Sequence, residues 1–479
     1  MSQASTEVPR LPYSPPSRVD VCSPAKMQVT TWRQGEGIRC EEGAHRRLMA
    51  YSQHLIIPDR SGTRVLLLED GSGRRLPSTT DSDWMLVGGA QSWVRERLGL
   101  DIVVLRCVLV DEHNTDEESG DAYLFTENLS EQVPLAGSWW DEEAITAVMD
   151  ERDRTAARQW FAEQREGSPP ALQPWEYPGW FTTAVDWIEA ALPETERVDQ
   201  YATWSVSSLH RVETAAGRYY FKAAPTIFRH EAVVTEMLAQ RFPGAIPRPL
   251  AIDGERGWML TADFGDQLVA TMELPHWVGS LDALASLQRE SVASVEFLLE
   301  SGCQDRGPRM LQSQVKELAS EGSEWLPDAL VQRLRARLSR FHELCEEVAS
   351  APIPNTLVHG DLHADNIVVS DGSYLIFDWT DACVAHPFID AATFLRYAER
   401  ASVDRATCER WRDHYLRGWE AVASYDVTSR LFELVEPLAA MHQVITYRWL
   451  LDSLDHSERW QFGSAMEDWL TRALAGPEL

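Results

Sequence analysis

The chain has 479 residues, of which 44% are hydrophobic and 25% are charged, values that are typical of soluble globular proteins. Its formal net charge of -30 argues against nucleic acid or an anionic membrane as the main partner, because both are bound by basic patches. The residues show no pattern of a signal peptide or a transmembrane run, and the seven cysteines are too scattered for a disulfide framework or a zinc site. These features predict a soluble, cytoplasmic protein.

The first part of the chain is expected to hold a disordered segment and then a small domain. Residues 1–27 are rich in Ser and Pro and lack periodic apolar residues, which indicates disorder. The run 91–98, which stops before Gly99, predicts a short helix, and the acidic stretch 141–165 predicts one or two more. Apolar runs predict strands at 55–57, 65–68, 102–110 and 122–125.

The order strand, strand, short helix, strand resembles the Nudix hydrolase fold, whose signature runs Gly-x5-Glu-x7-Arg-Glu-x-x-Glu-Glu-x-Gly. When the last glycine is placed on Gly99, one metal-binding glutamate falls on Glu96. The other signature positions fall on Trp84, Ser92, Trp93 and Arg97. One carboxylate cannot hold a hard cation in a hydrolytic site. Residues 28–165 are therefore expected to form a small, degenerate α/β Nudix-like domain without hydrolase activity. A sensor or dimerisation module and a structural appendage both stay open as its role.

Residues 166–180 form the best candidate for a linker, because Gly167 to Pro174 contain three prolines and break all periodicity. Two strands, at 204–212 and 218–222, then predict a hairpin that ends at Lys222. An amphipathic segment from His230 to Arg241 follows this hairpin and carries two glutamates.

The most informative stretch lies further along the chain, at residues 357–378. An apolar strand leads into His359-Gly360-Asp361, Asn366 follows, and a later apolar run ends at Asp378. His-x-Asp-x-x-x-x-Asn is the spacing of a kinase catalytic loop, in which the Asp receives the substrate hydroxyl and the Asn holds magnesium. A carboxylate just past the next apolar run is placed to ligate magnesium that bridges nucleotide phosphates.

This loop, together with Asp378-Trp379, resembles the aminoglycoside phosphotransferase and choline kinase family of small-molecule kinases. The resemblance implies an α+β, bilobal protein-kinase-like fold. Its N-lobe would span residues 181–264 and hold the nucleotide, and its C-lobe would span residues 265–479 with the catalytic loop and a helical acceptor-binding region. It also implies that Asp361 is catalytic and that Asn366 and Asp378 bind Mg²⁺.

For the nucleotide, the resemblance implies that Lys222 contacts the phosphates and that a carboxylate on the next helix fixes this lysine. Glu231 fits the family pattern better, and Glu236 is the alternative. Four more residues complete the expected nucleotide site: Ser207 and Ser208 in a turn of small hydroxyl residues, and Thr261 and Asp263 where a strand leads toward the hinge between the lobes.

The expected function is transfer of the γ-phosphate of ATP or GTP to a hydroxyl of a small acceptor. His359 is expected to support the loop, and Asp390 to be structural. The net charge favours a cationic acceptor, such as an aminoglycoside-type antibiotic or an amino alcohol, although solubility explains the charge equally well. The acids of the expected acceptor region are Asp361, Asp365, Asp381, Asp390 and Glu399. The alternative is a nucleotide-binding pseudokinase that signals through its N-terminal domain, against which the intact motif residues count. The acceptor and the oligomeric state stay open.

Overall fold

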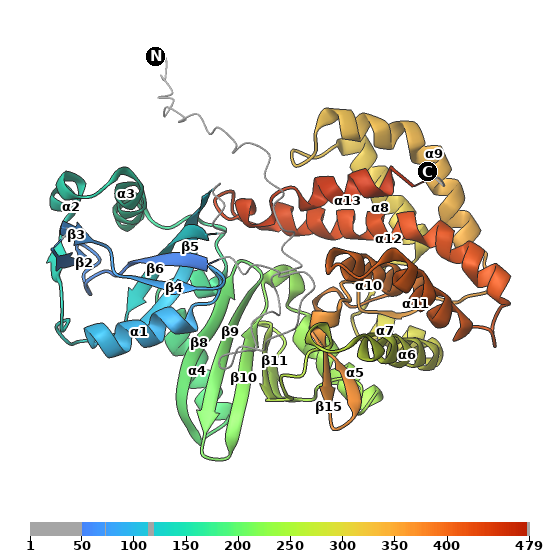
Figure 1. Ribbon diagram of the computed structural model, residues 1–479, viewed down its shortest axis with the longest axis horizontal. Helices are drawn as coiled ribbons and strands as arrows, with labels where there is room; N and C mark the ends of the chain where they lie inside the picture. Colours follow the sequence, from blue (N-terminus) through green and yellow to red (C-terminus); the bar gives the residue numbers. More distant parts are fainter. Residues whose placement is uncertain (1–49, 72, 114–118, 477–479) are drawn as a thin grey trace, which may run out of the picture.

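The computed structural model describes residues 50–71, 73–113 and 119–476, so the segment 1–27 that was expected to be disordered lies outside the described residues. Figure 1 shows three parts: an N-terminal domain in blue and teal, a green sheet beside it, and a helical region in yellow to red. Among the described residues, no helix combines the length and apolarity that crossing a bilayer requires.

The described part of the N-terminal domain, from residue 50 on, contains two small sheets and three helices, in the order that the apolar runs predicted. One sheet has the order β4-β1-β6-β5, with β1 and β6 parallel and the other pairs antiparallel. Its strands are β1 (Ala50–Ile56), β4 (Ser78–Asp81), β5 (Ile102–His113) and β6 (Ser119–Asn128). The other sheet consists of β2 (Val65–Asp70), β3 (Gly73–Arg75) and β7 (Ser138–Trp140). The helices are α1 (Gly88–Leu98), α2 (Glu142–Val148) and α3 (Glu151–Glu166).

Two residues at positions where the Nudix signature would have a glutamate pack in the hydrophobic core. Trp84 is buried in the main core, and Trp93 packs against that core from α1. Glu96 lies on the exposed side of the same helix. Helix α1 ends at Gly99, whose φ of 66° places it in the left-handed region that favours glycine at the end of a helix.

The segment 166–180 leaves α3 and reaches the next helix through a short 3₁₀ turn, η2 (Pro174–Glu176). Trp175 and Glu176 of this turn are buried. The Trp175 indole N–H donates to the carbonyl of Trp204 over 3.0 Å. The segment that the sequence indicates as a linker is therefore packed against the sheet that follows it.

That sheet is five-stranded and antiparallel, with the order β11-β12-β10-β9-β8. Helix α4 (Trp180–Ala191) covers one face, where Ala184 and Ile188 pack on Phe221 and Trp258. The strands are β8 (Thr195–Trp204), β9 (Ser207–Thr214), β10 (Gly217–Ala223), β11 (Pro249–Asp253) and β12 (Trp258–Ala262). After β10, the 3₁₀ turn η3 (Thr226–Phe228) leads into helix α5 (Glu231–Arg241), which packs beside β11.

The N-terminal domain covers the outer edge of this sheet, strand β8. The Val87 N–H donates to the Tyr201 carbonyl over 3.1 Å, and the Thr203 N–H donates to the Met85 carbonyl over 3.0 Å. The buried side chain of Gln200 bonds to the N–H and the carbonyl of Val104 in β5, at 2.6 and 2.8 Å. The contact between these two parts of the chain is thus built partly from backbone hydrogen bonds.

The rest of the described chain is mainly helical, as the family resemblance implied. Two short sheets carry the loops of interest: β13 (Gln304–Asp305), β17 (Cys383–Ala385) and β14 (Thr356–Val358) form one, and β15 (Ile367–Ser370) and β16 (Ser373–Ile376) form the other. The helices are α6 (Leu274–Ser291), α7 (Val295–Glu300), α8 (Pro308–Glu321), α9 (Asp328–Ala349), α10 (Phe388–Arg400), α11 (Arg405–Arg417), α12 (Tyr425–Ser453) and α13 (Ala465–Ala473). A sheet lobe followed by a helical lobe is the α+β, bilobal arrangement that the sequence predicted.

Candidate active site

The loop between β14 and β15 carries the predicted catalytic motif. Side chains of α10 and α12 fix its backbone through hydrogen bonds. Asp390, in the first turn of α10, accepts the N–H groups of His359 and Gly360 at 2.9 and 3.0 Å. Gln443 of α12 donates to the Gly360 carbonyl over 2.6 Å. Gly360 has a φ of 89°, and a Cβ there would lie 2.5 Å from the Asp381 carbonyl oxygen, so only glycine fits. The interpretation of Asp390 as structural is confirmed.

His359 supports the loop from the side. Its Nε2 lies 2.8 Å from the carbonyl oxygen of Phe377, to which it donates, and its ring contacts Trp379 at 4.8 Å between centroids. Burial lowers the pKa of His359 to about 4, so the ring is neutral near pH 7. A neutral ring that donates to a backbone carbonyl connects the two motif loops and supports them.

Lys222 of β10 is the centre of a buried ionic cluster. Its Nζ lies 2.7 Å from Glu231 Oε1 and 2.8 Å from Asp378 Oδ1. Burial disfavours the charged amine, but the two carboxylates outweigh this and raise the pKa of Lys222. Glu231, at the start of α5, makes this contact, whereas Glu236 lies further along the helix and is half-buried. The structure therefore favours Glu231 over the alternative.

Asp378 stands at an unusual backbone position, directly after β16. Its φ of 64° and ψ of 61° lie in the left-handed region, which Asp tolerates better than most residues. The Thr380 hydroxyl donates to Asp378 Oδ1, and lies 3.4 Å from the Lys222 amine. Burial raises the pKa of Asp378, but the opposite effect of Lys222 and Thr380 is larger. The pKa therefore lies below its usual value, and the carboxylate is ionised.

Asn366 lies at the end of the 3₁₀ turn η6 (Ala364–Asn366), just before β15. Its Nδ2 donates to the Asp361 carbonyl over 3.1 Å, and its backbone carbonyl accepts the Phe377 N–H over 3.1 Å. Its side-chain oxygen, Oδ1, is buried and has no hydrogen-bond partner among the described residues. An amide oxygen without a partner, in a residue whose backbone bonds to the neighbour of Asp378, fits an oxygen-coordinated Mg²⁺. No group of three or more His, Cys, Asp or Glu in the described parts could hold a metal alone, so phosphate oxygens and water would complete its coordination.

The predicted catalytic residue, Asp361, lies in the middle of the loop. Its Oδ1 accepts a hydrogen bond from the Tyr397 hydroxyl over 3.1 Å. Its Oδ2 lies 3.9 Å from His363 Nε2, and His363 Nδ1 lies 3.5 Å from Asp365. Burial raises the pKa of Asp361 above its usual value. A desolvated carboxylate of this kind is a better proton acceptor than one in water.

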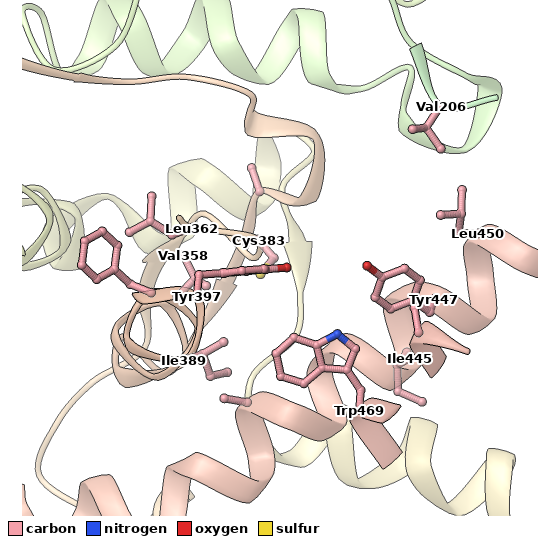
Figure 2. Packing of buried hydrophobic residues seen from close by; sticks show 14 of the residues in the cluster. Val206, Val358, Leu362, Cys383, Ile389, Tyr397, Ile445, Tyr447, Leu450 and Trp469 are labelled. Carbon is pink, nitrogen blue, oxygen red and sulfur yellow. The ribbon is translucent and has the colours of Figure 1, made fainter. Parts of the chain in front are cut away.

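Further aromatic side chains lie beside Tyr397, whose hydroxyl bonds to Asp361. Figure 2 shows the Tyr397 hydroxyl directed toward the side of Tyr447, with the indole nitrogen of Trp469 between and below them. The rings of Tyr397 and Trp469 are 6.5 Å apart. The Trp469 N–H is buried and has no partner among the described residues. The sequence analysis did not single out Tyr397, which lies on the same face of α10 as Asp390, two turns further along.

The structure does not bring every expected nucleotide residue to this site. Lys222 pairs with Leu209 across the sheet, so Ser208 must lie on the opposite face, where its hydroxyl bonds to His210 at 2.8 Å. The Ser208 side chain is therefore not at the candidate site. Ser207 is on the same face as Lys222, but its hydroxyl accepts the Trp204 indole N–H over 2.9 Å.

The expected hinge residues lie at the end of β12. Thr261 is buried opposite Tyr220, and the Asp263 N–H donates to the Arg218 carbonyl over 3.0 Å. The Asp263 carboxylate accepts the Gly265 N–H over 2.9 Å. These bonds fix the backbone that joins the two lobes. The next residue, Phe264, packs against Phe377 at 5.2 Å between ring centroids, and so connects the hinge to the Asp378 loop.

One comparison with known proteins finds a family for part of this chain. The model of the phosphotransferase enzyme family matches residues 202–431, which include the lysine, the catalytic loop and Asp378. The match begins after the N-terminal domain, for which the Nudix resemblance stays a prediction. Comparison with curated proteins gives no match.

Among solved structures, the chain is similar to choline kinase LicA from Streptococcus pneumoniae, with 15% identity, a TM-score of 0.45, and coverage of 62% of this chain and 98% of that one. It is also similar to an ethanolamine kinase from Plasmodium vivax, with 11% identity, a TM-score of 0.47, and coverage of 70% and 93%. A macrolide 2'-phosphotransferase from Brachybacterium faecium gives 18% identity, a TM-score of 0.43, and coverage of 62% and 99%. The family match supports a phosphotransferase enzyme, in which residues 202–431 are similar to the phosphotransferase enzyme family.

Proposed function

We propose that this phosphotransferase is a small-molecule kinase that transfers the γ-phosphate of ATP or GTP to a hydroxyl of its acceptor. The observation that carries the proposal is the buried cluster of Lys222, Glu231 and Asp378, combined with the free Oδ1 of Asn366. A cation that two carboxylates hold in place, beside oxygen atoms suited to magnesium, is what phosphoryl transfer requires of a protein.

Each motif residue has a role that follows from its position. Lys222 binds the nucleotide phosphates, and Glu231 holds the lysine extended when phosphate displaces its contact with Asp378. Asp361 orients the acceptor hydroxyl and accepts its proton as the oxygen attacks the γ-phosphate. Asn366 and Asp378 would hold Mg²⁺, which offsets the negative charge of the phosphates when bound.

The same proposal assigns the domains. Residues 181–264 form the N-lobe, residues 265–479 form the C-lobe, and residues 28–165 form a Nudix-like domain that lacks the carboxylates for hydrolysis, with residues 166–180 between. The alternative, a pseudokinase, requires the loss of a catalytic or metal-binding group. Asp361, Asn366, Asp378 and Lys222 are all present, and the ionic contacts of Lys222 are formed. We therefore favour the active kinase.

For the acceptor we propose a cationic, amine-bearing compound, and two acids of the loop support this. Asp361 and Asp365 keep partly exposed carboxylates, at 17% and 27%. The other acids are used differently. Asp390 is buried under the loop, and Glu399 lies 3.3 Å from Arg396. Burial raises the pKa of Asp381 to about 7, so this carboxyl is only partly ionised near neutral pH. The free, buried cysteines of the described chain support a reducing compartment such as the cytoplasm.

A screen for nucleotide consumption tests the proposal. The wild-type protein would be mixed with Mg-ATP or Mg-GTP and a library of hydroxyl compounds, with Asp361→Asn as the matched control. We expect at least one compound to stimulate consumption, and the Asn variant to lower turnover by about a hundredfold or more with little change in nucleotide affinity. Stimulation that survives in the Asn variant would remove Asp361 from the mechanism.

A further inference from the structure

The turn between β8 and β9, at the place where a kinase covers the nucleotide phosphates, is packed into the helical lobe. Ser205 and Val206 form the tip of a two-residue hairpin turn closed by the pair Trp204 and Ser207. Trp204, Ser205 and Val206 are all buried. Figure 2 shows Val206 facing Leu450 and Tyr447 of α12, so the hairpin spans the space between the two lobes.

One side chain of the C-terminal region holds this tip. Gln461, in the 3₁₀ turn η8 (Arg459–Phe462), accepts the Ser205 N–H over 3.2 Å and the Ser205 hydroxyl over 2.7 Å. Its own amide donates to Glu458. The ring of Phe462 packs on Trp204 at 5.7 Å. Gln461 therefore fixes the tip through polar bonds, and Phe462 fixes the residue before it through apolar contact.

The N-terminal domain supports Gln461 from behind. Arg106 of β5 lies with its Nε 3.7 Å from Glu458 Oε1, and its Nη2 donates to both oxygens of Glu163 in α3 at 2.6 Å. Trp84 of the same domain packs on Trp460, next to Gln461, at 5.2 Å. A continuous path of contacts thus runs from α3 and β5, through Glu458 and Gln461, to the turn.

The segment 166–180 adds a third support. Besides the bond from Trp175 to the Trp204 carbonyl, Glu176 accepts the Gln173 N–H over 2.6 Å and lies near Arg106 and Glu458. Burial raises the pKa of Glu176 to about 7, and burial together with Glu176 raises the pKa of Glu458 well above its usual value. A single arginine thus faces several carboxyl groups. Arg106 Nε, Glu176 Oε1 and Glu458 Oε1 are buried without a hydrogen-bond partner among the described residues, so the network is held by charge as well as by its hydrogen bonds.

The apolar and buried polar contacts of the β8–β9 turn show whether it can readily leave the helical lobe. Lifting the turn would expose Trp204 and Val206 to water and leave the buried Gln461 oxygen without its two donors. Exposing two large apolar side chains and stranding a buried polar group each oppose opening. The turn is therefore held permanently in the closed position.

We infer that Gln461, supported by Glu458 and Arg106, is a positioning residue that holds the β8–β9 turn over the nucleotide phosphates. The N-terminal domain is then a structural part of the phosphate-binding apparatus. The inference rests on the proposed kinase function, because it assumes that nucleotide lies under this turn.

Calorimetric titration of the full-length protein with Mg-ATP and Mg-GTP tests the inference without knowledge of the acceptor. For the nucleotide that the wild type binds, we expect Gln461→Ala to raise Kd by about tenfold and Ser205→Ala by about threefold, because the turn loses its fixed position. Ser464→Ala is the matched control, since it removes an exposed hydrogen bond to Asp468 close to Gln461 in the chain, and should leave Kd unchanged.

A second pair of variants tests the contribution of the N-terminal domain. Arg106→Met should weaken nucleotide binding by about threefold, and Arg106→Lys should restore part of this loss because it keeps the charge beside Glu458. Arg95→Met is the matched control, because Arg95 also pairs with the N-lobe, through Asp199 at 3.1 Å, but at a place that does not lead to the turn. Each variant would be titrated below its melting temperature, so that lost stability is not read as lost affinity.

The outcomes separate the two proposals. If the wild type binds neither nucleotide, the kinase function itself fails and the inference fails with it. If the wild type binds and Gln461→Ala binds within twofold of it, with an unchanged circular dichroism spectrum, the positioning role is overturned while the kinase function stands. Should Gln461→Ala not fold, Ser205→Ala decides, because it deletes one hydroxyl and keeps the backbone N–H bond.

Discussion

The hydroxyl of Tyr397 donates a hydrogen bond to Oδ1 of Asp361 over 3.1 Å, from one turn before the end of α10. The bond fixes the orientation of the carboxylate that the proposed mechanism uses. It leaves Oδ2, which faces His363, to accept the proton of the acceptor hydroxyl.

The first prediction concerns this bond. Tyr397→Phe keeps the ring in its packing place and removes only the donor, so the Asp361 carboxylate is free to rotate. A hydrogen bond to a charged group contributes about 1.5 kcal/mol or more, so we expect kcat to fall about tenfold while the nucleotide KM stays constant. Steady-state kinetics with an acceptor found in the screen measures both. Tyr374→Phe, whose hydroxyl contacts His276 instead, is the control. An unchanged kcat would show that the bond has no part in turnover.

The second prediction concerns the metal ligand and uses the left-handed backbone of Asp378. Asp378→Asn removes the charge but suits that backbone, whereas Asp378→Ala removes the charge and strains the backbone by about 1 kcal/mol. Both variants should lose detectable Mg-nucleotide binding in calorimetry and keep the fold by circular dichroism. Both variants also lose the ion pair with Lys222, so the added strain should appear as a lower melting temperature of the Ala variant relative to the Asn variant. Wild-type affinity in either variant would show that Asp378 is not a ligand.

The third prediction concerns the N-terminal domain. Because Glu96 is the one signature carboxylate left and lies on an exposed helix face, the protein should hydrolyse no nucleoside diphosphate derivative at this domain. The assay would follow magnesium-dependent cleavage of the pyrophosphate bond in such compounds to a nucleoside monophosphate, by the full-length protein and by Glu96→Gln. A hydrolytic activity that Glu96→Gln abolishes would overturn the degenerate assignment.

The fourth prediction concerns pH and stability. Burial raises the pKa of Glu176 from 4.5 to about 7 in the folded protein, among Arg106, Tyr177, Asp455 and Glu458. The folded state therefore holds a proton that the unfolded state releases. The stability from this proton is fully present below about pH 4.5 and is lost as the pH rises through about 7. As the pH rises from 5 to 8, loss of the Glu176 proton should lower the free energy of unfolding by about 3 kcal/mol.

Urea denaturation at several pH values measures this effect. In Glu176→Gln the side chain cannot ionise, so its free energy of unfolding should fall less over the same range than that of the wild type. Glu166→Gln, which changes an exposed glutamate ten positions before it, should behave like the wild type. Parallel curves for Glu176→Gln and the wild type would contradict the assignment.

The fifth prediction concerns the acceptor. Attraction of a cation by the partly exposed Asp361 and Asp365 is screened by salt. The acceptor KM should therefore rise with ionic strength, and the nucleotide KM should change less because Lys222 and its partners are buried. Kinetics from low to high salt with the best acceptor would measure both constants. A neutral or acidic acceptor with salt-independent kinetics would leave the cationic proposal without support.

The sequence was sufficient to predict candidate-site residues that lie close together in the chain, because their spacing forms a recognisable motif. Asp361, Asn366 and Asp378 come from one short stretch, and the structure places their loops together through the Phe377 N–H and the Asn366 carbonyl. The choice between Glu231 and Glu236 needed the structure, because five positions along a helix point in different directions and only the packing of α5 decides which one meets Lys222.

The sequence was insufficient to predict which side chains reach the candidate site when strand register or contacts between distant parts of the chain determine this. Ser208 was expected at the phosphates, but a shift of one residue in a strand moves a side chain to the opposite face. Tyr397 meets Asp361 from 36 positions away, and Gln461 meets Ser205 from 256 positions away. No local pattern marks such pairs, since they exist only when the helical lobe has folded.

Strand β8 is the outer strand of the N-lobe sheet. Residues 85–87 and 104 of the N-terminal domain bond to the edge of β8 that no other strand of this sheet pairs with. An uncovered edge strand is a template for pairing with another chain. Because the N-terminal domain precedes β8, it leaves the ribosome first and can fold before that edge is synthesised. The order of the two domains thus protects the nascent chain from edge-to-edge aggregation. Removal of the N-terminal domain should therefore lower the yield of monomeric protein during expression, whether or not the kinase site can still form.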